Sequence, residues 1–139
     1  LHNSIKDRVS IIKEYSDENI VLVGNEAKLH QVFLNVLTNA EQSIAESGLI
    51  TVKTSRVDDV INVVIQDNGC GISEQNLKKI TDPFFTTKEP GKGTGLGLSI
   101  TQTILEEHNG KIFIESKIGV GTTITIKLPQ TNDNPNFNC

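Results

Sequence analysis

The first part of the chain combines short strand-like stretches with one long amphipathic segment. β-Branched residues cluster in residues 6–14 and 20–23, a composition that predicts two strands. From Glu26 to about Ala45, apolar residues recur at offsets of three, four, seven and eight positions, which predicts a helix with one buried face. Gly48 follows this segment and is typical of a helix end.

The rest of the chain predicts two hairpins that are separated by a long loop and a second helix. The predicted elements are strands over 49–57 and 60–67, a loop over 69–97, a helix over 96–108 that closes on Asn109-Gly110, and strands over 111–116 and 122–128. Six of the eleven glycines lie in the loop, and loops of this length inside compact domains are commonly functional or mobile. We therefore expect an α+β fold, a two-layer sandwich in which about three helices cover one face of a mixed, mostly antiparallel sheet.

The length of 139 residues is enough for one domain, which we expect to cover residues 1–129. A polar tail over 130–139, rich in asparagine, is expected to be disordered. The chain contains no methionine, so we expect it to be part of a longer protein.

Charge and composition exclude several classes of function. A net charge of −4, from 13 basic and 17 acidic residues, argues against a nucleic-acid surface, which needs clustered Lys and Arg. Uninterrupted apolar runs are far shorter than the ~20 residues of a membrane-spanning helix, so we expect no direct membrane contact. Cys70 and Cys139 form neither a disulfide framework nor a zinc pattern, and reduced cytosol is the default location.

One carboxylate faces the predicted core. Asp67 shares a strand face with Ile61, Val63 and Ile65, because alternate residues of a strand point the same way. A buried carboxylate without a partner costs several kcal/mol, and no Lys or Arg lies at a natural pairing distance in the neighbouring sequence. The alternative is a turn aspartate that accepts hydrogen bonds from the backbone amides of residues 67–69.

Thr122 begins a second core-facing row, which continues with Ile124, Ile126 and Leu128. Taken alone, an inward threonine is commonly satisfied by backbone groups. Together with Asp67 it predicts a polar pair at the rim of an apolar pocket. This layout suits a flat heterocycle with hydrogen-bonding edges.

Two asparagines border the apolar face of the first long helix. At about 100° per residue, Asn39 lies at the edge of this face and Asn35 lies roughly 40° beyond it. Ordinary surface polarity is the alternative interpretation, but asparagine is a poor helix former and two in mid-helix need an explanation. Amide oxygens at the border of a site suit a hard cation such as Mg²⁺.

A glycine-rich segment, GKGTGLGL at 91–98, immediately precedes the second long helix. Glycines let the backbone approach a ligand, and a helix start presents free N–H groups, so the combination favours phosphate. The segment is not a Walker loop, because it lacks the Gly-Lys-Ser/Thr ending. No acidic ribose-binding residue follows about 20 residues later in a βαβ unit either.

Taken together, these motifs resemble the histidine-kinase-type ATP-binding domain. This is the Bergerat fold that sensor kinases share with type II topoisomerases, mismatch-repair ATPases and heat-shock chaperones. Five segments match its motifs in order: QVFLNVLTNAEQSIA at 31–45 (N box), DNGCGI at 67–72 (first glycine box), DPFFTTK at 82–88 (F box), GTGLGLSI at 93–100 (second glycine box) and GVGTTITIKLP at 119–129 (closing strand). The F box and the second glycine box resemble the sensor kinases in particular.

The resemblance implies roles for the residues that would surround the adenine base of ATP. Asp67 would accept a hydrogen bond from the adenine amino group, and Gly69 and Gly71 would let the chain pass the base. Thr122 would join the adenine contact through water.

The resemblance also implies a phosphate and metal site. Asn39 would coordinate Mg²⁺, Asn35 would stand near the phosphates, and both would be catalytic together with Lys88. Phe84 would belong to a mobile ATP lid with Phe85, and Lys88 and Lys92 would supply positive charge. The further ATP-binding residues that the resemblance implies are Ile72, Gly93, Thr94, Gly95, Leu96, Gly97 and Leu98.

The residue at position 35 distinguishes between branches of the family. In the members that hydrolyse ATP, a glutamate four residues before the metal-binding asparagine activates water as a general base. Here that position is Asn35, and an amide cannot take a proton. Glu41 lies on a different helical face, so it is no obvious substitute. The sequence therefore predicts transfer to a partner rather than hydrolysis.

The resemblance implies that the γ-phosphoryl group of ATP passes to a histidine on a separate dimerisation domain and then to an aspartate of a response regulator. His2, His30 and His108 all lack the acidic context of such an acceptor, so we expect the acceptor outside this chain. The parent protein would act in the cytoplasm, with or without a membrane anchor. The alternatives are an ATP-hydrolysing conformational clamp, an anti-sigma-type serine kinase and a degenerate nucleotide-binding module.

Overall fold

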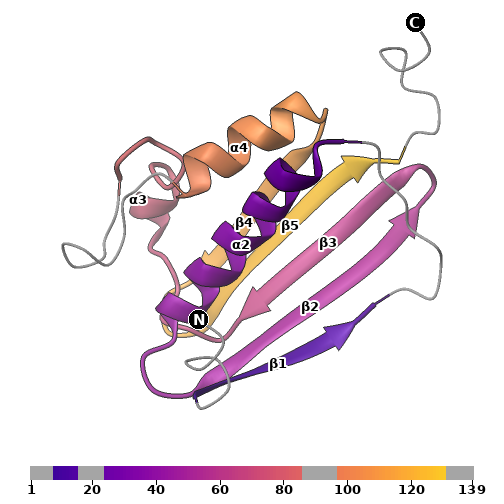
Figure 1. Cartoon of the computed structure of the whole chain (residues 1–139). Helices are drawn as coiled ribbons and strands as arrows, with labels where there is room; N and C mark the ends of the chain where they lie inside the picture. The colour runs from indigo at the N-terminus through magenta and orange to yellow at the C-terminus, as the bar shows by residue number, and fades with distance from the viewer. Residues whose placement is uncertain (1–7, 16–23, 86–96, 131–139) are drawn as a thin grey trace, which may run out of the picture.

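The computed structural model describes residues 8–15, 24–85 and 97–130, which form one sheet with helices on one face. Five strands lie in the order β1-β2-β3-β5-β4. Figure 1 shows the two longer helices, α2 and α4, side by side across the same face of this sheet. This architecture confirms the predicted two-layer α+β sandwich.

The strands follow the predicted hairpins closely. Their bounds are β1 Val9–Glu14, β2 Gly48–Val57, β3 Val60–Asp67, β4 Lys111–Lys117 and β5 Gly121–Pro129. β1 runs parallel to β2, and the other three pairings are antiparallel, so the sheet is mixed and mostly antiparallel. Parallel strands need a crossover connection, which α2 supplies between β1 and β2.

The helices are α2 (Glu26–Ser43), the short α3 (Glu74–Leu77) and α4 (Gly97–Glu107). Asn25 caps the start of α2, because its side chain accepts a hydrogen bond from the Lys28 amide at 3.0 Å. The α3 turn interrupts the predicted loop and was not expected from the sequence. Four residues are too few to show a helical period, although the side chain of Ser73 caps this turn at the Asn76 amide, 3.1 Å away.

The first long helix ends earlier than predicted, at Ser43 rather than near Ala45. Ile44, which the helical pattern included, has extended backbone angles (φ −96°, ψ 114°) but stays buried. Arg8 binds this end of the helix, because its guanidinium donates to the carbonyl oxygens of Glu41 and Ile44 and pairs with the Glu41 carboxylate. A side chain distant in sequence thus satisfies carbonyls that a longer helix would have used.

The core lies between the sheet and the two longer helices. The inward row of each central strand meets the apolar stripe of α2, in which Val32 and Val36 are fully buried. The principal members from the sheet are Ile50, Ile61, Ile65, Ile124, Ile126 and Leu128, and those from α4 are Ile104 and Leu105. The predicted closure of α4 is confirmed, since Asn109 takes the left-handed conformation (φ 58°) that ends it.

Three predictions fall on other parts of the chain. The strand over 20–23, most of the glycine-rich segment before α4 and the tail beyond Gln130 lie outside the described residues. Within residues 8–15, 24–85 and 97–130, no helix is both long and apolar enough to cross a membrane.

Truncating a fully buried residue of α2 should destabilise the fold. Val36 is 0% exposed, whereas Leu34 on the same helix is 40% exposed. We expect Val36→Ala to lower the free energy of unfolding by about 2 kcal/mol, because it leaves a cavity in the core. Leu34→Ala should lower the free energy of unfolding by roughly 0.5 kcal/mol or less. Urea denaturation measures both, and equal losses would contradict this arrangement of the helix.

Candidate functional site

A row of three polar side chains crosses one end of the sheet. Asp67 ends β3, Thr122 lies opposite it on β5, and Ser116 lies opposite Thr122 on β4. Both Asp67 and Thr122 continue rows of core residues, and both are buried although they are polar. Asp67 is 7% exposed and Thr122 is 6% exposed. The structure therefore brings the predicted polar pair together and adds Ser116 to it.

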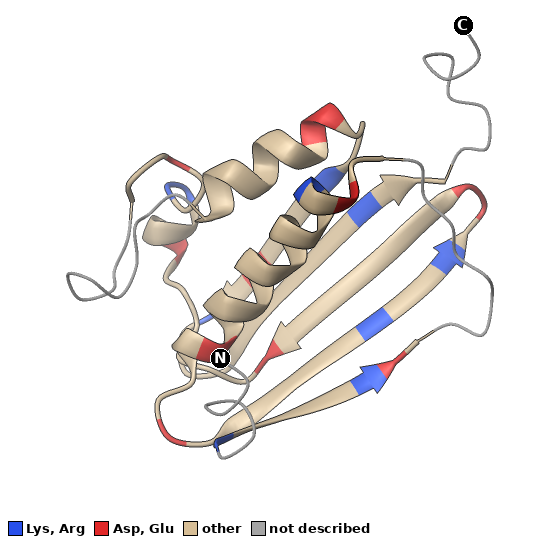
Figure 2. Cartoon of the chain, in the orientation of Figure 1, with Lys and Arg blue, Asp and Glu red and all other residues tan. Residues whose placement is uncertain are grey.

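Two donors converge on the same oxygen of Asp67. Oδ1 accepts a hydrogen bond from the Gly69 amide at 2.8 Å. Oγ of Ser43 lies 3.2 Å from the same oxygen and 2.8 Å from the Ala40 carbonyl oxygen, so its single proton is shared between these two acceptors. Figure 2 shows the acidic end of β3 beside the C-terminal turn of α2, from which Ser43 reaches it. The turn contact that the sequence offered as an alternative is thus present, and the carboxylate is buried as well.

Burial controls the acidity of this carboxylate. Loss of solvation raises the pKa of Asp67 above its usual value, and hydrogen bonds from Gly69, Ser43 and the backbone of Thr122 oppose this rise only in part. No ion pair holds Asp67 in the described part of the chain. The site therefore contains an acceptor whose charge is not neutralised by a neighbouring cation.

Close backbone contacts fix the loop that follows Asp67. A Cβ atom at Gly69 would lie 2.2 Å from Oγ of Ser43, and one at Gly71 would lie 2.2 Å from the carbonyl oxygen of Lys117. Gly71 also has a positive φ of 78°. Glycine is required at both positions because the loop packs against the end of α2 and against the β4–β5 turn.

A second cluster forms where α4 begins. Nδ2 of Asn35 donates to the Gly97 carbonyl oxygen at 3.1 Å and to Oγ1 of the fully buried Thr101 at 3.3 Å. The same glycine faces Asn39, because a Cβ at Gly97 would lie 3.9 Å from Nδ2 of Asn39. Both predicted asparagines therefore face the N-terminal turn of α4, and Asn35 attaches this helix to α2.

A polar stripe on α2 connects the two clusters. Asn35, Asn39 and Ser43 follow one another at intervals of four residues and share a face of the helix. Eight residues of helix span about 12 Å. At one end of the stripe lies a buried carboxylate, and at the other lies a helix N-terminus with amide donors. Such an arrangement can hold an elongated ligand with a donor-bearing ring at one end and an anion at the other.

Sequence reasoning missed two hydroxyl groups of this site, although signals for both existed. Ser43 lies four residues after Asn39 and so continues the stripe that the two asparagines begin. Ser116 lies opposite Thr122 in the hairpin that the sequence predicted across residues 117–121. Pairing residues across a predicted turn would have found it.

Glu41 is held away from this stripe, as its predicted helical face implied. It is only 9% exposed, and its carboxylate forms an ion pair with Arg8. An engaged carboxylate on another face is poorly placed to act as a general base at the asparagine cluster.

The other predicted residues fall into three groups. The amide of Ile72 donates to Oγ of Ser116 at 2.7 Å, so it joins the polar row. Leu98 is buried, and Phe84 is 72% exposed with a positive φ of 66°. The predicted residues that lie outside the described residues are Lys88, Lys92, Gly93, Thr94, Gly95 and Leu96.

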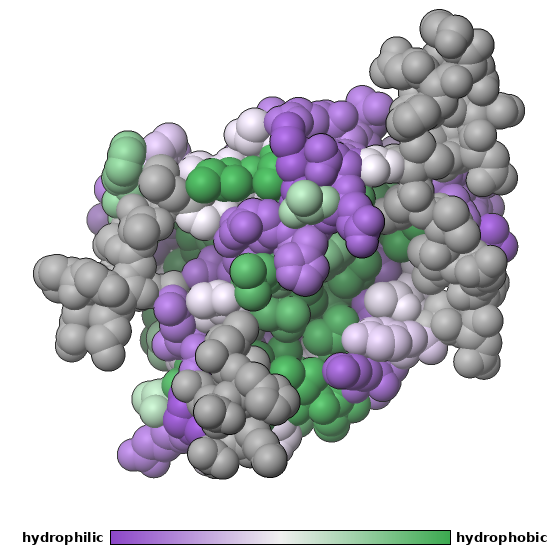
Figure 3. Space-filling model, viewed as in Figure 1, coloured by the Kyte–Doolittle hydropathy of each residue, from purple (hydrophilic) through white to green (hydrophobic). Residues whose placement is uncertain are grey.

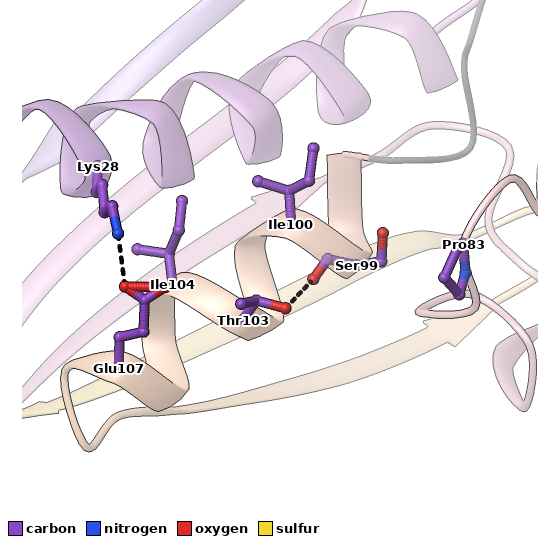
Figure 4. A pocket seen from close by; sticks show the side chains of 7 residues that line it. All are labelled: Lys28, Pro83, Ser99, Ile100, Thr103, Ile104 and Glu107. Carbon is purple, nitrogen blue, oxygen red and sulfur yellow. Dashed lines mark hydrogen bonds and ion pairs between the residues drawn. The ribbon is translucent and has the colours of Figure 1, made fainter.

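A separate apolar groove of about 420 Å³ lies along the outer side of α4. Figure 4 shows it between the Lys28–Glu107 ion pair, which joins α2 to α4, and Pro83. Figure 3 shows hydrophobic side chains at the surface of this helical face, where Leu34 and Ile100 are exposed. None of the predicted site residues that the structure describes lines the groove.

Comparison with known proteins identifies similar sequences. Residues 24–132 match the family model described as "Histidine kinase-, DNA gyrase B-, and HSP90-like ATPase". The chain is 36% identical over 132 residues to sporulation kinase C of Bacillus subtilis, covering 94% of this chain and 30% of that protein. It is 43% identical over 126 residues to the signal transduction histidine-protein kinase AtoS of Escherichia coli, covering 90% of this chain and 20% of AtoS. The chain thus spans less than a third of the length of these relatives.

Solved structures with the same fold include the catalytic domain of histidine kinase ThkA in a nucleotide-free form. The TM-score is 0.82 and the sequence identity is 31%, with 94% of this chain and 85% of the ThkA chain covered. A mycobacterial sensor histidine kinase, MprB, matches with a TM-score of 0.79 and 26% identity, covering 92% of this chain and 87% of that chain.

Replacing Asp67 should stabilise the isolated fold. Because its pKa is raised in the folded state, the folded protein binds this proton at a pH at which the unfolded chain has lost it. The contribution of Asp67 to stability is therefore full at low pH and is lost as pH rises through the folded-state pKa. We expect Asp67→Asn to raise the midpoint of thermal unfolding at pH 7. At low pH, the midpoint of this variant should equal that of the unmodified protein.

The control is Asp59→Asn, which changes an exposed carboxylate at the β2–β3 turn. Differential scanning calorimetry across pH measures both variants. A lower midpoint for Asp67→Asn at pH 7 would show that the buried carboxylate stabilises the fold when it is charged.

Proposed function

This chain belongs to the histidine kinase-, DNA gyrase B- and HSP90-like ATPase family, and we propose that it is the ATP-binding catalytic part of a sensor histidine kinase. In this proposal it binds Mg²⁺-ATP and transfers the γ-phosphoryl group to a histidine on a dimerisation domain. The observation that carries the proposal is the polar stripe of α2, which connects the Asp67 carboxylate to the N-terminus of α4.

The base would bind at the end of the stripe where Asp67 is buried. A buried carboxylate with no ion-pair partner among the described residues accepts strongly from an exocyclic amino group, which adenine provides. Oδ1 of Asp67 already receives the Gly69 amide and Ser43, so its orientation is fixed before a ligand arrives. Thr122 lies directly opposite and would contact the base through water.

The phosphates would lie at the other end, where α4 begins. The first N–H groups of a helix have no partner within the helix and carry partial positive charge, which suits an anion. The remaining glycines of the second glycine box and the two predicted lysines, Lys88 and Lys92, would complete this cradle.

The asparagine cluster fits Mg²⁺. This ion is usually held by one or two protein oxygens together with phosphate and water, so the amide oxygen of Asn39 would suffice as a protein ligand. When bound, Mg²⁺ would neutralise phosphate charge, which matters for a protein of net charge −4. Asn35 would hold α4 in place beside it, through its bonds to Gly97 and Thr101.

Asn35 favours phosphoryl transfer over hydrolysis. Its Oδ1 accepts from Gln31 at 2.6 Å and its Nδ2 donates to α4, so both ends of this amide are engaged. An amide is not a general base, and Glu41 is paired with Arg8. Position 35, where the hydrolysing branches carry a glutamate, therefore has no general base that could activate water.

The phosphoacceptor would lie outside this chain. Within the chain, His108 has a structural role, because its Nε2 accepts from the Asn25 amide at 3.0 Å and its Nδ1 contacts the Ile104 carbonyl oxygen at 2.8 Å. Histidine kinase ThkA, which is 28% identical to this chain, has been solved in complex with the response regulator TrrA. This complex supports a response regulator as the downstream partner. We place the parent protein in the cytoplasm.

Nucleotide binding should depend on Mg²⁺ and on Asn39. We expect Asn39→Ala to weaken ATP binding in magnesium buffer about tenfold or more, as expected for loss of a charge-assisted contact. A chelator should weaken binding to the unmodified chain and should affect the variant much less. Isothermal titration calorimetry measures each affinity.

Asn62→Ala is the matched control, because Asn62 lies on β3 one position away from the inward row. It should leave the affinity for ATP unchanged. An affinity that a chelator does not alter would contradict the proposed metal site.

Phosphoryl transfer should require a second domain. We expect the isolated chain to bind ATP without labelling itself, and to label the dimerisation domain of its parent when that domain is supplied with γ-labelled ATP. Acid-labile label identifies phosphohistidine. Acid-stable label would instead support a serine kinase, and steady release of phosphate by the isolated chain would support an ATP-driven clamp.

A further inference from the structure

Ser116 takes part in three hydrogen bonds at the end of the polar row. Its Oγ lies 2.7 Å from the Ile72 amide, 2.9 Å from the Gly121 carbonyl oxygen and 2.7 Å from Oγ1 of Thr122. A serine hydroxyl has one proton to donate and two lone pairs to accept with. All three capacities are therefore used.

The chemistry of the partners determines the direction of each bond. The contact between Oγ of Ser116 and Oγ1 of Thr122 is compatible with either hydroxyl as the donor. The Ile72 amide can only donate and the Gly121 carbonyl can only accept, so all three bonds form together only when the single proton of Ser116 goes to Gly121. The remaining lone pair of Ser116 must then receive the proton of Thr122. Thr122 has no other proton, so its hydroxyl presents only lone pairs to any further partner.

We propose that Ser116 is a positioning residue for base specificity, because it consumes the Thr122 proton and leaves the Asp67–Thr122 pair as hydrogen-bond acceptors only. This inference rests on the proposed function, in which a purine base lies at this end of the site. Ionised Asp67 has no proton to donate, and Thr122 now has none available. The pair accepts from a 6-amino group or from a water molecule that donates to it.

An acceptor-only pair selects against the wrong base as well as for the right one. A 6-oxo purine, such as inosine or guanine, presents a carbonyl oxygen where adenine presents an amino group. Facing this oxygen toward the Asp67 carboxylate, which would contact the base directly, opposes two acceptors, and Thr122 has no proton to offer to either of them. Buried polar groups left unpaired in this way are an effective means of rejection. Ser116 would contribute to this rejection without touching the base.

The β4–β5 hairpin holds Ser116 and Thr122 rigidly enough to maintain the direction of the hydrogen bond from Thr122 to Ser116. Thr122 and Ser116 are paired residues of one hairpin, and Thr122 is almost fully buried. The Gly119 amide donates to the Cys70 carbonyl oxygen at 2.9 Å, which fastens the hairpin turn to the loop after Asp67. Rotation of the Thr122 hydroxyl toward the base would break its hydrogen bond to Ser116.

The test compares the affinities of the whole chain for ATP and for inosine triphosphate in magnesium buffer, by isothermal titration calorimetry. We expect the unmodified chain to prefer ATP. Ser116→Ala releases the Thr122 proton to donate to a 6-oxo group, so the preference for ATP should fall about three- to tenfold, the size of one hydrogen bond. Ser55→Ala, on an exposed part of β2, is the matched control and should leave the preference unchanged.

A double-mutant cycle separates this role from simple loosening of the loop. In a Thr122→Val background there is no hydroxyl to redirect, so adding Ser116→Ala should not change the preference further. An equal fall in both backgrounds would overturn the inference, and so would an unchanged preference in Ser116→Ala. No preference for ATP in the unmodified chain would instead contradict the base contact of the proposed function.

Discussion

The burial of the Asp67 carboxylate is the constraint on which this end of the molecule depends. A charged group in a core-facing row costs free energy unless donors reach it, and here they come from two separate segments. Ser43 comes from the end of α2, and the Gly69 amide comes from the loop after β3. Because these donors must meet at one oxygen, the end of the helix, the loop and the sheet are held in fixed relation.

The glycines of the first glycine box follow from the same constraint. The loop can bring its amide to Asp67 only by packing against Ser43 and the β4–β5 turn, where a side chain at residue 69 or 71 would collide with neighbouring atoms. These glycines therefore have a reason in packing that is independent of any ligand. A site made in this way has its acceptor oriented in advance, which lowers the ordering cost of binding.

The second organising contact is the attachment of α4 to α2 through Asn35. Its amide satisfies both the buried Thr101 hydroxyl and the first carbonyl of α4. The N-terminus of α4 is thereby placed beside Asn39, on the same stripe that leads to Asp67. Directional hydrogen bonds fix both ends of the proposed elongated site, and the hydrophobic core supplies stability without specifying either end.

The sequence by itself determined the two longer helices, the two hairpins and the order of the motifs. Helical and two-residue periods placed α2, α4 and both hairpins to within a few residues, because they depend on local hydrophobic spacing. The same spacing showed that Asp67 and Thr122 face inward and that Asn35 and Asn39 border a buried face. These inferences need only the geometry of a single helix or strand.

The tertiary structure decided which of these residues meet. Arg8 binds the end of α2 at Glu41, from 33 residues away in sequence, and no local pattern could reveal this contact. Ser43 and Ser116 gain their roles only when α2, β3, β5 and β4 lie side by side, because a hydrogen bond depends on a distance and angle in space. The sequence supplied the polar groups, and the packing of the elements decided that Asp67 and Thr122 lie opposite each other.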